Sequence, residues 1–326
     1  MAQRSVPIPA PGPARRLWGA ITSTTGFRRL AGLNLFLLWL IIPSGGIVRL
    51  TDSGLGCTDW PLCDNANVVP EASYHAWIEY TNRMVSLVVI GVSVLTWLAA
   101  RRADGRPDTA RRAALVAALG SVGQIPLGGI TVLFDLHPLL VASHFLLSIV
   151  ALTAGVLCFI SADDNVRGTA RAWSPRQGPL AAVTAAALLA VVVTGVLVTS
   201  AGPHSGDPEV IRRFGRIDTA AYVHVRAVIV FCCLAALLAL WVWRRGTADR
   251  ATWWLLAAFV PVLAAQITIG EVQWRVELPW QLVSFHVTIA GLVWVIGTAI
   301  AWRLMRPAQA TATAPAPAPV ATPVEA

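Results

Sequence analysis

The chain has 326 residues, of which 56% are hydrophobic and only 13% are charged, and its mean hydropathy is +0.64. A soluble protein of this length needs more charged surface to stay in solution, so the composition excludes an ordinary soluble enzyme. The formal net charge of +8 does not indicate a nucleic-acid partner, because the arginines lie between long apolar runs, where they report membrane orientation.

The apolar residues form eight runs, each near the ~20 residues that a helix needs to cross a bilayer core. The predicted spans are residues 30–49, 76–100, 113–133, 139–160, 178–200, 219–243, 252–273 and 281–303. They predict an all-α integral membrane protein with two four-helix halves, residues 30–160 and 178–303. Residues 1–29 are expected to form an N-terminal tail, 161–177 a linker, and 304–326 a disordered Pro/Ala-rich tail.

All 25 basic residues are arginines, and 18 of them flank the spans on the side of the two termini. Positive charge accumulates on the cytoplasmic side, so both termini are predicted in the cytoplasm and the protein in the cell membrane. The loop 50–75 then lies outside. An oxidising compartment there permits a disulfide between Cys57 and Cys63.

The two halves resemble each other at a spacing of 142 residues. The matching pairs are Gln124/Gln266, Ile125/Ile267, Gly128/Gly270, Leu140/Leu282, Val141/Val283, His144/His286, Tyr80/Tyr222 and Asn82/His224, of which only the last is not identical. Four spans per half give both halves the same orientation, so the sequence predicts a parallel repeat of two pseudo-symmetric bundles.

Three of the six histidines, His144, His224 and His286, lie within predicted spans, near their outer ends. An ionisable group inside a bilayer is costly and needs a partner or a purpose. A hydrogen bond between helices would explain one such histidine, but three at related positions favour a shared site. His224 and His286 are therefore candidate axial ligands of a heme iron. Zinc is disfavoured, because no Cys, Asp or Glu accompanies them in the same apolar segments.

In the first half His144 is the candidate iron ligand, but Asn82 stands where the second half has His224. An amide is a weak ligand, so we expect one strong ligand and one open or weakly held face. Glu79 lies one helical turn before Asn82, on the same face. Its carboxylate either points at this site or forms an ion pair with Arg83, and both alternatives remain open.

Arg83, Arg226 and the other outer arginines are candidates for holding heme propionates, because guanidinium binds carboxylates with two parallel hydrogen bonds. His75, His137 and His204 lie in or near outer loops. Each of these histidines is expected at the surface or beside a propionate, and not as an axial ligand.

These residues resemble the heme A synthase family over residues 30–303. The motifs that carry the resemblance are Gly54-Leu55-Gly56-Cys57, Trp60-Pro61-Leu62-Cys63 and Ile78-Glu79-Tyr80-Thr81-Asn82-Arg83, together with the single histidines of the later spans. The resemblance implies an enzyme that oxidises a methyl group of heme O to the formyl group of heme A, for use in terminal oxidases.

The resemblance also implies a role for each candidate residue. Heme b would lie between His224 and His286, and the substrate heme O would lie near His144. Glu79 would be the residue most needed for catalysis. The remaining implied feature is a redox-sensitive disulfide beside the substrate site, formed by Cys57 and Cys63.

Two departures from the family pattern bear on this reading. Many members have His in place of Asn82, and some carry a second cysteine pair in the second-half outer loop, which here reads SAGPHSGD over residues 200–207. The expected partners are heme O, membrane lipid, heme O synthase and terminal oxidase assembly proteins.

Two other functions are alternatives to heme A synthesis. A di-heme b-type electron-transfer cytochrome needs two permanently ligated hemes, and Asn82 argues against it. A heme-handling transporter or assembly factor would suit a parallel repeat. However, the ionisable groups deep in the spans are histidines at one outer level, without a polar path across.

Overall fold

The computed structural model describes residues 12–309 except 58, 64–67, 71–72, 103–104, 205, 208 and 210–214. The helices in this part of the chain are α1 (Pro13–Thr22), α2 (Thr24–Leu50), α3 (Tyr74–Arg102), α4 (Asp108–Leu133), α5 (Pro138–Arg167), α6 (Gly178–Ala201), α7 (Ile217–Arg245), α8 (Arg250–Arg275) and α9 (Trp280–Met305). By length and composition, α2 to α9 are eight helices able to cross a membrane. The chain is therefore an all-α integral membrane protein, as predicted.

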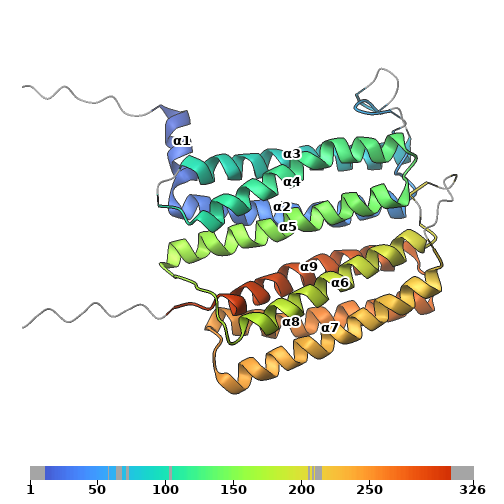
Figure 1. Cartoon of the computed structure of the whole chain (residues 1–326). Helices are drawn as coiled ribbons and strands as arrows, with labels where there is room; N and C mark the ends of the chain where they lie inside the picture. The colour runs from blue at the N-terminus through green and yellow to red at the C-terminus, as the bar shows by residue number, and fades with distance from the viewer. Residues whose placement is uncertain are drawn as a thin grey trace, which may run out of the picture.

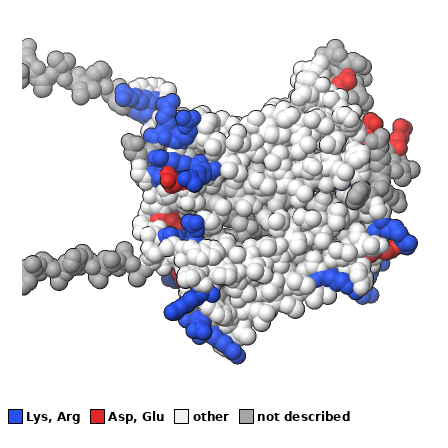
Figure 2. All heavy atoms as spheres, in the orientation of Figure 1, with Lys and Arg blue, Asp and Glu red and all other residues white. Residues whose placement is uncertain are grey.

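The eight long helices lie in two groups, α2 to α5 and α6 to α9, side by side (Figure 1). Helix α1 and the C-terminal end of α9 lie at the same end of the bundle (Figure 1). Charged side chains gather at the two ends of the molecule, and the belt between them is uncharged on the face shown (Figure 2). Such a belt fits the hydrocarbon layer of a bilayer.

The predicted spans agree with the helices, but two helices extend beyond them. Helix α2 begins at Thr24, because the Ser23 side chain accepts a hydrogen bond from the Gly26 N–H at 3.0 Å and caps the first turn. Helix α5 continues to Arg167, where Gly168 adopts a left-handed conformation with φ 64°. The linker predicted over 161–177 is therefore helical in its first part.

The two predicted tails are more ordered than expected. Helix α1 lies within the predicted N-terminal tail and packs against α2 and α3. At the other end, α9 continues to Met305, and residues 306–309 run beside the linker. There the Gln309 N–H donates to the Ala170 carbonyl at 2.9 Å. The prediction of disorder is wrong for residues 304–309, because these backbone groups find partners. The rest of both predicted tails lies outside the described residues.

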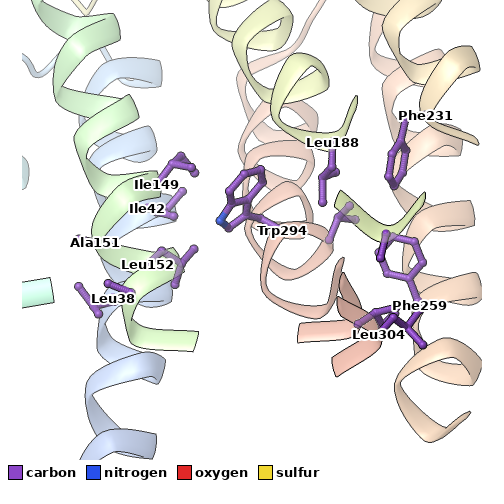
Figure 3. Close-up of a cluster of buried hydrophobic side chains, with 14 of the residues drawn as sticks. Leu38, Ile42, Ile149, Ala151, Leu152, Leu188, Phe231, Phe259, Trp294 and Leu304 are labelled. Atoms are coloured by element: carbon purple, nitrogen blue, oxygen red, sulfur yellow. The ribbon is translucent and has the colours of Figure 1, made fainter. Parts of the chain in front are cut away.

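The largest cluster of buried apolar side chains joins the two halves. It includes side chains of α2 and α5 on one side and of α6 and α9 on the other (Figure 3). Trp294 of α9 reaches towards the first half, and its indole N–H donates to the Thr153 hydroxyl at 2.9 Å. Trp39 of α2 donates to the Thr288 carbonyl at 3.3 Å and packs on Gly291, where a Cβ would lie 2.9 Å from the ring. Each half therefore donates a tryptophan indole hydrogen bond to the other half.

An ion network at the arginine-rich end joins the linker to both halves. Arg171 is 7% exposed and contacts Asp164 at 2.6 Å and Asp249 at 3.5 Å. Arg303 contacts Asp249 at 3.1 Å. Burial alone would raise the pKa of Asp249. Hydrogen bonds from Thr252 and the charges of Arg303 and Arg171 outweigh burial and lower that pKa below its usual value.

We predict that Asp249→Asn lowers the free energy of unfolding by about 1–3 kcal/mol, because two buried guanidinium groups lose a counter-charge. Asparagine caps a helix as well as aspartate does, so the cap of α8 should survive and the change isolates the charge. Thermal unfolding in detergent measures the effect.

The pH dependence of this contribution follows from the sign of the pKa shift. The folded pKa of Asp249 lies below its unfolded value, so the stabilisation is complete above about pH 5 and is lost as the pH falls through the folded pKa. The matched control is Asp218→Asn, whose side chain is 71% exposed and should change stability by less than about 0.5 kcal/mol. Equal effects of the two variants would contradict the prediction.

Candidate functional site

His224 of α7 is seated on the neighbouring helix α6. Its Nδ1 forms a hydrogen bond with the Thr194 hydroxyl at 3.1 Å. Its ring packs on Gly195, where a Cβ would lie only 3.2 Å from Cε1. The hydrogen bond at Nδ1 fixes the direction of the ring and leaves Nε2 to act as a ligand.

The His286 ring of α9 packs on helix α8 as the His224 ring packs on α6, but the side-chain contact is made by Nε2 and not by Nδ1. Its Nε2 lies 3.1 Å from the Gln266 amide nitrogen, and a Cβ at Gly270 would lie 2.9 Å from its Cε1. Its Nδ1 is buried with no hydrogen-bond partner among the described residues. A buried polar atom of this kind is rare in a folded protein, and a ligand is one explanation for it.

The second half can hold a heme between these two histidines. Helix α7, which carries His224, and helix α9, which carries His286, both pack against α6. Helices α7 and α8, described along their whole length, make almost no backbone contact with each other, whereas α3 packs along α4 in the first half. The residues therefore fit an iron porphyrin with one imidazole on each face. No group of three or more His, Cys, Asp and Glu side chains suited to a metal ion occurs in the described part of the chain.

His144 of α5 has the corresponding place in the first half. A Cβ at Gly128 of α4 would lie 3.3 Å from its Cε1, and its Nδ1 is buried without a partner among the described residues. Gln124 donates to the His144 carbonyl at 3.0 Å and to the Ser148 hydroxyl at 2.7 Å. The packing of His144 on Gly128 thus parallels that of His286 on Gly270. Asn82 of α3 is engaged differently, since its Oδ1 accepts from the Ser44 hydroxyl at 2.9 Å.

Glu79 is buried, with 5% of its surface exposed, and both carboxylate oxygens are hydrogen-bonded. Oε1 accepts from the Arg83 guanidinium at 2.6 and 3.1 Å, and Oε2 accepts from the Cys57 N–H at 2.8 Å. Arg83 also donates to the carbonyls of Asp59 and Leu62. The ion-pair alternative is therefore present in the structure. The carboxylate also ties the outer loop to α3.

Cys57 and Cys63 form the expected disulfide, and both are buried. Within the loop that they close, Trp60 lies against Gly129 of α4, where a Cβ would lie 2.6 Å from the indole. Gly129 follows Gly128, the residue that seats His144. The loop 57–63 therefore packs beside the layer of the first-half histidine.

The other candidate residues of the outer end mostly contact protein groups. Arg226 lies on an exposed face of α7, stacks on the Tyr222 ring and donates to the Tyr222 carbonyl at 3.1 Å. Its contact with a propionate stays a prediction. His75 forms a hydrogen bond with the Ser53 hydroxyl at 3.0 Å, and His204 forms one with the Leu278 carbonyl at 3.0 Å. His137 caps α5, because its Nδ1 accepts from the Leu139 N–H at 3.4 Å.

Sequence reasoning missed Arg49. This arginine of α2 is half-buried and crosses to the second half, where it donates to the His204 carbonyl at 2.8 Å and to the Thr199 carbonyl at 2.7 Å. Beside it the Gly54 N–H donates to the Gly206 carbonyl at 2.7 Å. The sequence analysis counted Arg49 only among the outer arginines that could hold propionates, whereas its partners in the structure are backbone carbonyls of the second half.

Comparison with known proteins places this site in a family. The sequence profile of the cytochrome oxidase assembly protein family matches residues 28–298. Three similar curated proteins are each named heme A synthase. The protein from an Exiguobacterium species is 33% identical over 35% of this chain and 38% of its own length. The protein from Lysinibacillus sphaericus is 29% identical over 43% of this chain and 42% of its own length. The protein from Symbiobacterium thermophilum is 30% identical over 43% of this chain and 46% of its own length. The chain thus spans less than half the length of the curated relatives it matches.

We predict that Gly270→Val lowers the heme content of the purified protein at least tenfold, because the added side chain would displace the His286 ring. The absorption of bound heme per chain measures the loss. Gly91→Val is the control, since a Cβ there has no described atom within 4 Å and the variant should keep its heme. Full heme content in Gly270→Val would mean that His286 does not hold the iron.

Proposed function

Because this chain belongs to the cytochrome oxidase assembly protein family, the heme A synthase family that its sequence resembles, we propose that it is a membrane oxidoreductase that oxidises a methyl group of heme O to the formyl group of heme A. The observation that supports this most is the pair His224 and His286, each of which packs on a glycine of a neighbouring helix and has one ring nitrogen within hydrogen-bonding distance of a side chain there.

In this proposal the second half holds heme b through His224 and His286. Heme b supplies one-electron transfer when bound, and a site with both axial faces filled suits that task. Thr194 orients the His224 ring and Gln266 orients the His286 ring. The chain's own contribution is to fix the positions of the two imidazoles.

The first half binds the substrate heme O through His144 in the same proposal. Trp60 packs against Gly129 of α4, next to the glycine that contacts His144, and in this proposal it limits the entry of water at this layer. Glu79 is the proposed catalytic residue. Arg83 and the Cys57 N–H fix its carboxylate, which would take up a proton or stabilise positive charge at the reacting methyl group.

The proposed location is the cell membrane, with both termini in the cytoplasm and the heme sites near the outer face. The outer placement agrees with the Cys57–Cys63 disulfide, which needs an oxidising compartment to persist. We propose that this disulfide is redox-sensitive. The proposed partners are heme O synthase, which would deliver the substrate, and terminal oxidase assembly proteins, which would receive the product.

We predict that Glu79→Gln retains bound heme but lowers heme A formation at least a hundredfold. Glutamine can still accept the hydrogen bond from Cys57, so the loop should stay in place, whereas the negative charge is lost. Chromatography of extracted hemes after expression with a heme O source measures the product.

Thiol alkylation of the same Glu79→Gln preparation is the control for the structural role of the carboxylate. The disulfide should remain closed, as in the parent protein. Normal heme A formation by this variant would rule out Glu79 as the catalytic residue.

We predict that His224→Ala removes a low-spin, six-coordinate heme signal from the absorption spectrum, because one axial ligand of heme b is lost. His204→Ala is the matched control, since this outer histidine bonds the Leu278 carbonyl and should leave the signal unchanged. An unchanged spectrum in His224→Ala would move the permanent heme elsewhere. Extraction of heme b alone, from protein supplied with heme O, would favour the electron-transfer cytochrome.

A further inference from the structure

Two hydroxyl–glycine pairs occupy matching places in the two halves. The sequence Ser44-Gly45-Gly46-Ile47-Val48 near the end of α2 resembles Thr194-Gly195-Val196-Leu197-Val198 near the end of α6. In each pair the hydroxyl forms a hydrogen bond with a side chain of the next long helix. Ser44 bonds Asn82 at 2.9 Å across 38 residues, and Thr194 bonds His224 at 3.1 Å across 30 residues. The larger separation reflects the longer first outer loop.

The two glycines differ in what lies above them. A Cβ at Gly195 would meet the His224 ring at 3.2 Å, whereas a Cβ at Gly45 would meet no described atom within 4 Å. Asparagine is shorter than histidine, so the Asn82 amide reaches the hydroxyl without covering the glycine. The first half therefore has the hydroxyl and the glycine that contact an imidazole in the second half, but a smaller side chain, Asn82, lies beside them.

We propose that Ser44, Gly45 and Asn82 form a binding pocket for a small exogenous ligand on the open axial face of the first-half heme. This inference rests on the proposed function, because it takes His144 to hold the opposite face. The ligand class is a small lone-pair donor such as water or a diatomic gas. With its Oδ1 engaged by Ser44, Asn82 has its amide N–H groups to offer such a ligand.

The difference between the two halves has a chemical meaning. His224 closes the second-half iron to exchange, whereas the first-half iron keeps a position that small molecules can enter. Ser44 acts as a positioning residue, because it holds the Asn82 amide away from Gly45. The same seat should accept a histidine at position 82, with Ser44 bonding its Nδ1 as Thr194 does for His224.

The test uses the full-length protein loaded with two equivalents of hemin, then reduced and exposed to carbon monoxide. In the parent protein about one heme of the two per chain should bind carbon monoxide. Asn82→His should lower the carbon-monoxide-reactive fraction at least tenfold and add a second low-spin signal. Adding Gly45→Val to Asn82→His should reverse this change, because a branched side chain would occupy the space that the ring needs.

The outcomes separate the two proposals. Two retained hemes in the parent protein, neither of which binds carbon monoxide, would overturn the pocket and leave the proposed function standing. A heme content that stays at one per chain, and that His144→Ala does not change, would overturn both, because the first half would then hold no heme. The parent protein alone supplies the first result, so the test does not depend on the folding of a variant.

Discussion

Each membrane histidine of this protein is pressed against a glycine of a neighbouring helix, and the rest of the site depends on this contact. An added Cβ at Gly270 would collide with the imidazole, and one at Gly128 or Gly195 would make an unusually tight contact with it. The glycine lets the helices approach closely and fixes where the ring can lie. A neutral imidazole held in this way keeps one nitrogen for a ligand, which offsets part of the cost of placing a polar group at membrane depth.

The two halves use this contact to different ends. The second half carries two such histidines, on α7 and α9, and α7 makes almost no backbone contact with α8. The first half, in which α3 packs along α4, carries the disulfide loop, one such histidine and Asn82. In the proposed function, a heme with two histidine ligands in the second half and a heme with one in the first half would give electron transfer and substrate chemistry separate places.

Much of this architecture could be predicted from the sequence, because apolar runs and arginine counts depend on simple physical costs. The eight spans and the disulfide between Cys57 and Cys63 were expected from local residue types and from the family motifs, and both are present. The weak ligand position expected at Asn82 stays a prediction. The role of Arg49 could not be predicted, since its partners are carbonyl groups more than 100 residues away. The Glu79 ion pair was one of two open alternatives, because spacing alone does not say which neighbour a carboxylate contacts. The correspondence between Ser44 and Thr194 could not be predicted from the repeat, because these residues are 150 positions apart and the repeat has a spacing of 142.

Arg49 at one end of the bundle and Arg171 at the other both tie the first half to the second. Together with the tryptophans between them, they pin the halves at three levels along the membrane normal. A hinge between the halves would have to break all three, so the halves are expected to behave as one rigid body. In the proposed function, an electron that passes between the site of His144 and the site of His224 and His286 would therefore cross a constant distance. The fold sets that distance, so no docking event between separate partners is needed.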